Sequence, residues 1–308
     1  MQKTAIENWR KGGEGEWGCG GGEWREREEK MSPDKGQRAP FPQNQNPWDY
    51  WNVKLFLDEA IANKYESNAQ RARVLSESWV DKEIYCPNCG HLEIDKYPNN
   101  QPVADFSCSN CHEDYELKSK QGSLGSKIVD GAYRTMLERL TSSSNPNFFL
   151  MDYDVTTLQV RNFLVVPKHF FVPEIIERRK PLAVTARRAG WVGCNILLNH
   201  IPQTGKIFLV RDKKAEPKAR VLAEWQKTLF LREEKEVTKK GWPLDVMRSI
   251  DKIGKSEFTL DDVYAFESEL SRLHPDNRHI KDKIRQQLQF LRDRGYVRFL
   301  GGGKYQRT

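Results

Sequence analysis

The spacing of apolar residues changes along the chain, and these changes predict where its helices lie. Between Lys54 and Trp79 apolar residues recur every three to four positions, which predicts two amphipathic helices. The same spacing predicts a helix from Ile128 to Leu140, with Ser126 as its N-cap. A further helix is expected from Pro217 to Arg232.

Short, continuous apolar runs predict the strands. Residues 148–151, 163–166 and 207–210 are almost entirely apolar, which is typical of strands buried on both faces. Strands that alternate with helices predict an α/β fold, a mixed sheet with flanking helices.

Helical spacing resumes after the charged run from Arg232 to Lys240, which we expect to link two domains. Helices are predicted at 243–253, from a Thr259 cap onward, and at 280–294. Two short strands around a glycine turn follow at 296–305. Three helices and a hairpin predict a winged helix, whose third helix enters the major groove of DNA.

The predicted third helix divides into two faces. Ile284, Leu288 and Leu291 share one face and should lie in the core. Residues 277–308 carry nine lysines and arginines against two aspartates, which favours a nucleic-acid surface. The residues expected to face DNA from this helix and the wing are His279, Lys281, Lys283, Arg285, Gln286, Lys304 and Arg307.

These elements divide the 308 residues into three parts. Residues 1–48 hold eight of the 21 glycines and are predicted to be a disordered tail. Residues 49–232 form the predicted α/β domain with its four-cysteine site, and residues 233–308 the predicted winged-helix domain.

The net charge of +7 favours an anionic partner, because lysine and arginine neutralise phosphates. No apolar run is long enough to span a membrane, and residues 1–30 lack the apolar core of a secretory signal. We therefore expect a cytoplasmic protein that needs no obligate protein partner.

Two C-x-x-C pairs, Cys86 with Cys89 and Cys108 with Cys111, are separated by 18 residues. This spacing is typical of a four-cysteine zinc site, and four thiolates leave no open position for water. The zinc would therefore be structural. Two disulfides are the alternative for a secreted chain, and His112 could replace one cysteine as a ligand.

An acidic residue and a Glu-x-Lys triplet flank the second cysteine pair. In a strand, Glu116 and Lys118 point to one face and Leu117 to the other. Asp105, Glu116 and the Leu117 carbonyl are therefore candidate ligands for Mg²⁺. Lys118 is the candidate to orient or deprotonate the attacking water in phosphodiester hydrolysis, because desolvation beside a cation can lower the pKa of a lysine.

Taken alone, this triplet is also typical of a solvated strand face, because 30% of the residues are charged. The zinc site favours catalysis, since closing the segment between Asp105 and Glu116 would hold both carboxylates on adjacent strands. We therefore predict Asp105, Glu116 and Lys118 as catalytic residues.

A second candidate DNA contact lies in the segment 185–193. Arg187 and Arg188 could bind phosphates, and Trp191 could wedge into the base stack or lie against the DNA. Alternatively, Trp191 fills the core while both arginines are solvated.

The pattern of Asp105 with Glu116, Leu117 and Lys118 resembles the PD-(D/E)xK nuclease signature. The run from about Tyr65 to Tyr305 resembles the family of DpnI-like, methyl-directed restriction endonucleases. The stretches that carry this resemblance are 67–75, 85–90, 101–106, 116–120, 130–133, 145–149, 179–182, 185–191, 193–196 and 283–289.

The resemblance implies a bacterial, cytoplasmic type II restriction endonuclease that cleaves double-stranded DNA at GATC sites carrying N6-methyladenine. Two other functions remain open from the residues. One is a zinc-ribbon and winged-helix regulator without catalysis, and the other is a repair or junction nuclease of the same fold.

Overall fold

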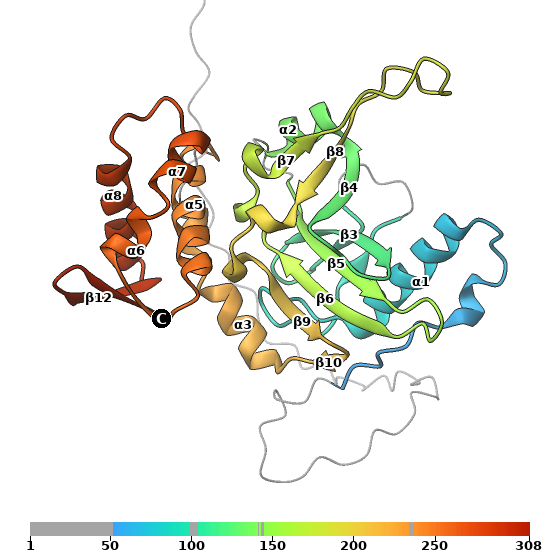
Figure 1. Cartoon of the computed structure of the whole chain (residues 1–308). Coiled ribbons are helices and arrows are strands. Elements are labelled where there is room, and N and C mark those ends of the chain that lie inside the picture. The colour runs from blue at the N-terminus through green and yellow to red at the C-terminus, as the bar shows by residue number, and fades with distance from the viewer. Residues whose placement is uncertain (1–51, 99–103, 141, 143–144, 234–236) are drawn as a thin grey trace, which may run out of the picture. The chain divides into compact units, whose positions relative to one another are not determined.

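The computed structural model describes residues 52–98, 104–140, 142, 145–233 and 237–308. The predicted tail at 1–48 lies outside the described residues. A seven-stranded mixed sheet runs through the α/β part in the order β1-β2-β3-β5-β6-β9-β10 (Figure 1). Its strands are β1 (Asp95–Lys96), β2 (Phe106–Ser107), β3 (Asp114–Gln121), β5 (Asn147–Tyr153), β6 (Val160–Val166), β9 (Ile207–Arg211) and β10 (Lys214–Ala215).

The middle of this sheet contains the strands predicted from apolar runs. Every residue of β5 is buried, and so is most of β6, which confirms strands covered on both faces. β3 pairs in parallel with β5 from Tyr115–Asn147 to Gln121–Tyr153, whereas the neighbouring pairs are antiparallel. The polar strand β3 is therefore attached to the most buried strand of the molecule.

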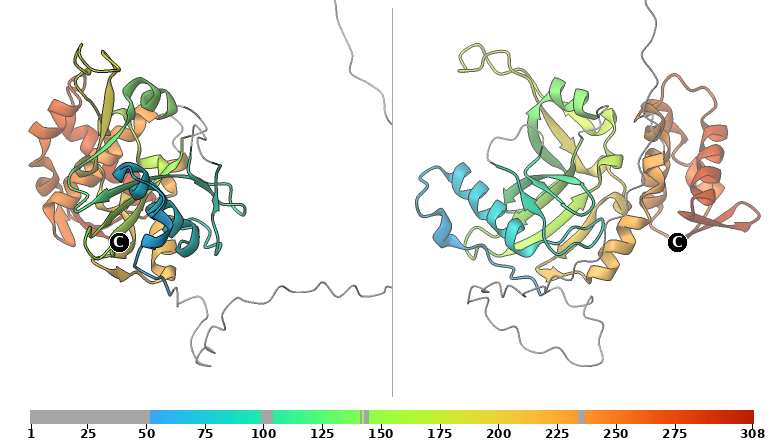
Figure 2. Two further views of the ribbon diagram at one scale, coloured as in Figure 1. Left: turned by 90° about the vertical axis from the view of Figure 1, so that its right-hand side faces the viewer. Right: turned by 180° about the vertical axis from the view of Figure 1, so that it is seen from behind.

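One face of the sheet is covered by α1 (Asn68–Glu83), as Figure 2 also shows. Trp79 of this helix packs edge-on against Phe163 of β6, with ring centroids 5.2 Å apart. The prediction of two amphipathic helices before Trp79 is wrong for the first, which is only the 3-10 turn η1 (Glu59–Ala62). Four residues close a single turn, too little to bury an apolar face.

A second, three-stranded sheet has the order β4-β8-β7, with β4 (Lys127–Ala132), β8 (Gly193–Leu197) and β7 (Ile176–Arg178). The predicted helix 128–140 is therefore half wrong, because α2 (Tyr133–Leu140) begins only after β4, and Ser126 does not cap it. In β4, Ile128 and Asp130 are buried whereas Val129 is 63% exposed. Because an aspartate is buried and a valine is exposed, the sequence of β4 does not show the alternation of apolar and polar residues that predicts a strand.

The α/β part ends with short turns and two helices. They are η2 (Lys168–Phe170), η3 (Pro173–Ile175), η4 (Leu198–His200), η5 (Gln203–Gly205), α3 (Lys218–Gln226) and α4 (Phe230–Glu233). The single helix predicted from Pro217 to Arg232 is interrupted near Thr228, whose hydroxyl donates to the Trp225 carbonyl at 2.7 Å. Such a bond offers the backbone an alternative to the helix.

The C-terminal part combines helices with a three-stranded sheet in the order β11-β13-β12 (Figure 1, orange to red). Its elements are α5 (Val237–Ile253), β11 (Glu257–Thr259), α6 (Leu260–Tyr264), α7 (Glu267–Leu273), α8 (Ile280–Asp293), β12 (Val297–Gly301) and β13 (Lys304–Arg307). Thr259 caps α6 in a reciprocal capping box with Asp262, as its sequence position predicted.

The helix predicted to begin at Pro243 starts earlier, at Val237, and contains Pro243 in its interior. Within the expected linker 232–240, the residues up to Glu233 belong to α4 and those from Val237 onward belong to α5. On α8, Ile284, Leu288 and Leu291 are fully buried, which confirms the predicted core face.

Two apolar cores hold these elements together. One lies between α1 and the sheet, and includes Trp79, Phe149 and Trp225. The other includes Phe148 and Leu231 together with buried residues of α5 and α8. No helix of the described residues is long and apolar enough to cross a membrane.

Candidate active site and DNA interface

Asp105 lies beside the edge of β3 because its backbone and its side chain both bind that strand. Its N–H donates to the Tyr115 carbonyl at 2.9 Å, and its carboxylate oxygen Oδ2 accepts the Leu117 N–H at 2.7 Å. β2 pairs only with the first two residues of β3. The Asp105 carboxylate, which lies just before β2, takes the place of a backbone acceptor for the next N–H of β3 on that side, that of Leu117. This contact joins Asp105 to the Glu-x-Lys triplet without using any side chain of the triplet.

Glu116 and Lys118 extend from the same face of β3, as the strand period requires. Lys118 Nζ lies 2.6 Å from Glu116 Oε1 and 2.5 Å from Asp130 Oδ1 of β4. The second oxygen of Glu116, Oε2, accepts from the guanidinium of Arg139 in α2 at 2.8 Å. The site thus gathers three carboxylates and two cationic groups from β3, β4, α2 and the segment just before β2.

The charge states follow from these contacts. Burial lowers the pKa of Lys118, but Glu116 and Asp130 outweigh burial and raise this pKa above its ordinary value. The sequence-based expectation that a neighbouring cation lowers the pKa of Lys118 concerns the site with its ion bound, and it stays a prediction. Burial, reinforced by Glu116, raises the pKa of Asp105.

The arrangement leaves ligand positions for a hard cation. Leu117 directs its N–H to Asp105, and within a strand the N–H and C=O of one residue point to the same side. The Leu117 carbonyl therefore points to the edge that Asp105 occupies. Asp105, Glu116 and this carbonyl are oxygen donors of the kind that Mg²⁺ prefers, and a cation between the two carboxylates would relieve their repulsion.

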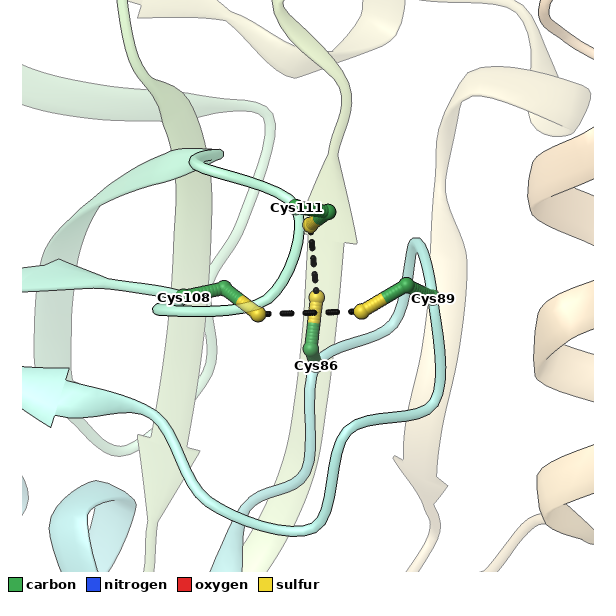
Figure 3. Close-up of side chains that lie close together, drawn as sticks. All are labelled: Cys86, Cys89, Cys108 and Cys111. Atoms are coloured by element: carbon green, nitrogen blue, oxygen red, sulfur yellow. Dashed lines mark hydrogen bonds between the residues drawn. The ribbon is translucent and has the colours of Figure 1, made fainter. Parts of the chain in front are cut away.

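The four cysteines form the metal-ligand cluster predicted from their spacing. Their sulfurs converge from two loops (Figure 3) and lie within 4.8 Å of one another, so they could hold a metal ion. Cys86 and Cys111 have sulfurs 3.5 Å apart, and Cys89 and Cys108 have sulfurs 3.6 Å apart. Sulfurs about 2.3 Å from a tetrahedral zinc are roughly 3.8 Å apart, whereas a disulfide needs about 2.05 Å.

The two cysteine loops repeat one backbone pattern. In the first, Gly90 N–H donates to the Cys86 carbonyl and Cys86 N–H to the His91 carbonyl, both at 2.8 Å. In the second, His112 N–H donates to the Cys108 carbonyl and Cys108 N–H to the Glu113 carbonyl. Gly90 and His112 occupy equivalent positions and both have positive φ, +77° and +56°. His112 therefore shapes a loop, and the described ligand cluster contains the four cysteines without it.

The cysteine cluster is bonded directly to the strand that bears Glu116. The Cys86 sulfur lies 3.1 Å from the Tyr115 hydroxyl, which is fully buried. Glu113, which follows the second loop, is buried and binds Asn147 of β5 at 2.8 Å and Arg232 at 2.7 Å. These contacts fix the second arm of the hairpin between Asp105 and Glu116.

The segment with Arg187, Arg188 and Trp191 lies in the long connection between β7 and β8, which projects from the small sheet (Figure 1). Both arginines are exposed and Trp191 is half-buried, so Trp191 does not fill the core. Its ring packs on Gly193, where a Cβ would approach it to 2.8 Å, and the Arg188 guanidinium lies 4.8 Å from its ring centre.

The residues predicted to face DNA from the C-terminal domain divide into two groups. The exposed ones are His279, Lys281, Arg285, Gln286 and Lys304. Lys283 is half-buried and donates to Gln286 at 2.7 Å, and Arg307 is paired with Asp251 of α5 at 2.7 Å. Within the first group, Lys281 also lies 3.5 Å from Glu267, so exposure and not the absence of a partner distinguishes that group from Arg307.

Sequence reasoning missed Asp130 and Arg139 as members of the site. Asp130 was assigned to a helix, and nothing near Arg139 in sequence is catalytic. A third omission is Glu77, a buried carboxylate of α1 that pairs with Arg73 and with Lys96 at 2.8 Å. Glu77, Arg73, Lys96 and Asp105 line one cavity of about 220 Å³. The only signal in the sequence was a charged residue in an apolar helix face.

Comparison with known families covers most of the chain. A family model described as DpnI, Dam-replacing family, matches residues 53–234. A second model, described as DpnI_C, Dam-replacing HTH domain, matches residues 238–307.

Proposed function

Because the chain belongs to the Dam-replacing family of methylation-dependent restriction endonucleases, we propose that it hydrolyses double-stranded DNA at GATC sites carrying N6-methyladenine, with Mg²⁺ as cofactor. The observation that carries the chemistry is the convergence of Asp105, Glu116 and Lys118 at the open edge of β3. A regulator without catalysis would not need this convergence.

In this proposal Asp105, Glu116 and the Leu117 carbonyl hold the ion, as in a PD-(D/E)xK nuclease. Bound Mg²⁺ would neutralise the phosphate and make a bound water nucleophilic. Lys118, kept charged by Glu116 and Asp130, donates a hydrogen bond to the attacking water or to the phosphate. The ion held by the carboxylates and the Lys118 ammonium would thus both offset the negative charge of one phosphate.

Zinc has a separate, structural role in this proposal. Four cysteine sulfurs close its coordination, so Cys86, Cys89, Cys108 and Cys111 would hold Zn²⁺ without an open position. The ion would close the hairpin that carries Asp105 and Glu116.

Methyl recognition is proposed for two surfaces. One is the projecting β7–β8 connection, where Arg187 and Arg188 would contact phosphates and Trp191 the methyl group. The other is the exposed face of α8 and the wing. One buried methyl contributes only about 0.8 kcal/mol, so reading both methyl groups of a palindromic site at two surfaces would strengthen discrimination.

Cleavage of matched duplexes tests the proposal. The whole chain with Mg²⁺ is expected to cut a duplex with methylated GATC and to spare the unmethylated duplex of the same sequence. Asp105→Asn is expected to abolish cleavage while DNA binding remains, since the catalytic groups act mainly in the transition state. Equal cutting of both duplexes would refute methyl dependence, and an active Asp105→Asn would refute the assigned site.

A further inference from the structure

We propose that Arg139 is an exchangeable counter-ion of the catalytic site. Arg139 holds one oxygen of Glu116; it cedes that oxygen to the divalent cation when the cation binds, and it then binds a phosphate of the DNA. This inference rests on the proposed metal-dependent cleavage and adds a residue that takes part in it.

The starting point is that both oxygens of Glu116 are occupied by cationic side chains. Lys118 Nζ contacts Oε1 at 2.6 Å and Arg139 contacts Oε2 at 2.8 Å. The three side chains are between 15% and 23% exposed, so water screens these contacts only partly. A metal ion that uses Glu116 as a ligand must therefore replace or weaken one of the two contacts.

Moving Lys118 would break two ion pairs, because Lys118 binds both Glu116 and Asp130. Lys118 is also bound to the buried Asp130 at 2.5 Å, so moving Lys118 would leave that carboxylate without its cation. An unpaired buried carboxylate is strongly destabilising. When Arg139 leaves, the incoming metal ion takes its place beside Glu116, and every carboxylate keeps a positive partner.

The charge balance suggests where Arg139 goes. Asp105, Glu116 and Asp130 carry three negative charges, and Lys118 with Arg139 two positive ones. Adding a divalent cation gives the site an excess of positive charge, which a DNA phosphate neutralises. A guanidinium binds a phosphate through two parallel N–H donors, so Arg139 has the geometry to accept this second partner.

A purely structural role of Arg139 predicts the opposite effect on metal affinity in the absence of DNA. If Arg139 only braced Glu116, removing it would loosen the carboxylate and weaken metal binding. If Arg139 competes with the metal, removing it strengthens metal binding in the absence of DNA.

The experiment compares the whole, zinc-loaded chain with Arg139→Met, Arg139→Lys and a matched control, Arg134→Met. Arg134 lies on the same helix, where it pairs with Glu138 at 2.9 Å and is almost fully exposed. Mn²⁺ binding without DNA is measured by calorimetry. Arg139→Met is expected to bind Mn²⁺ about fivefold more tightly, on the scale of one partly exposed ion pair. Arg139→Lys and Arg134→Met should match the wild type.

Cleavage of methylated duplex at saturating Mn²⁺ gives the second readout. Arg139→Met is expected to lower kcat on the order of 100-fold, as when one donor to the transition state is lost. Arg139→Lys should recover part of this loss, and Arg134→Met should cut normally. Tighter metal binding together with slower cleavage is a combination that misfolding does not produce.

Several outcomes overturn the inference. Mn²⁺ affinity of Arg139→Met equal to or below that of the wild type refutes competition with the metal, provided its melting temperature is unchanged; Arg139→Gln repeats the measurement if the methionine variant unfolds. Normal kcat in Arg139→Met refutes the phosphate contact. A wild-type chain that neither binds Mn²⁺ nor cuts DNA refutes the proposed function itself.

Discussion

Lys118 is held between two carboxylates, and the one that the sequence did not reveal is the more buried. Asp130 is 9% exposed and lies on a different sheet from Lys118. Its carboxylate lies 2.5 Å from Lys118 Nζ, so its role would be to aim the lysine. Lys118 would keep its charge through Glu116 alone, but not its direction.

Asp130→Asn is expected to lower kcat by roughly 10- to 100-fold with little change in DNA affinity, because a misdirected catalytic group costs rate and not binding. Single-turnover cleavage and a filter-binding titration separate the two quantities. Val129→Thr on the same strand is the control, since Val129 is exposed. A parallel loss of DNA binding in Asp130→Asn would point instead to a role in folding.

His169 makes stability depend on pH. It is 2% exposed, its Nε2 lies 2.8 Å from the Thr228 hydroxyl, and burial holds its pKa well below 6.5. Below pH 6.5 this histidine is therefore protonated in the unfolded chain but stays neutral in the folded chain. The free energy of unfolding contributed by this residue is complete above pH 6.5 and falls as the pH drops below it.

Between pH 7.5 and 5.5 this histidine should account for a loss of about 1.4 kcal/mol. His169→Gln, which retains a polar atom near Thr228, should lose that much less over the same range. Urea denaturation of both proteins at the two pH values measures the difference. Identical pH dependence of the two proteins would rule out the histidine as its cause.

The residues of the candidate site were predictable only where they are close in sequence. Asp105, Glu116 and Lys118 lie within 14 positions and are bracketed by cysteines whose spacing is diagnostic. Asp130 and Arg139 reach the site through sheet pairing and helix placement. Both depend on tertiary packing that a local pattern does not encode.

At the scale of elements, the cysteine hairpin determines whether Asp105 and Glu116 face each other. Asp105 precedes β2 and Glu116 lies in β3, and these strands pair over only two residues each. Two residue pairs cannot hold a hairpin in water without further support. We infer that bound metal supplies that support.

The chain is expected to carry one zinc ion, and a chelator strong enough to remove it should lower the melting temperature and abolish cleavage together. Native mass spectrometry counts the ion, and a thermal melt with and without chelator measures the stability. A metal-free chain that cuts DNA normally would contradict this dependence.

The β7–β8 connection presents Trp191 outside the core. Trp191→Ala is expected to reduce the preference for methylated over unmethylated duplex by several-fold, because the ring supplies apolar area on the scale of one methyl group. Competition binding at one salt concentration measures the ratio, since phosphate contacts cancel between the duplexes. Arg187→Ala should instead weaken both duplexes equally, and an unchanged ratio in Trp191→Ala would exclude the ring from methyl recognition.

Helices and strands were predictable where apolar residues are buried and polar residues are exposed. β5 and β6 are apolar and buried, so their sequence sufficed. β4 buries Asp130 and exposes Val129, which reverses the usual rule and explains why its helix prediction failed. The break near Thr228 escaped prediction because a hydroxyl contact, not a proline or glycine, interrupts the helix.

At the scale of the whole molecule, the α/β part and the helix-turn-helix domain share one apolar core. Phe230 of α4 lies 5.9 Å from Phe290 of α8, and the Tyr296 hydroxyl lies 3.2 Å from the Thr204 hydroxyl. Arg294 pairs with Glu233, and Gln203 N–H donates to Asp251 of α5. The predicted boundary at 232 and 233 stays a prediction, and a fragment cut there would expose this core.

The zinc-loaded chain is therefore expected to unfold in a single transition. Calorimetry should give equal calorimetric and van't Hoff enthalpies, which is the test for two-state unfolding. Phe290→Ala, which removes one ring from the shared core, should lower the midpoint without splitting it. Two separate transitions in the wild-type chain would show that the domains fold independently.

The dependence of the β2–β3 hairpin on its cysteine cluster has a consequence for a cell that makes this protein. If a bound ion supplies the support inferred above, a newly made chain that has not captured one would not hold Asp105 against Glu116, and it would leave the ribosome inert. Metal capture would then serve as a maturation step, and the supply of zinc would set the delay between synthesis and the first cut.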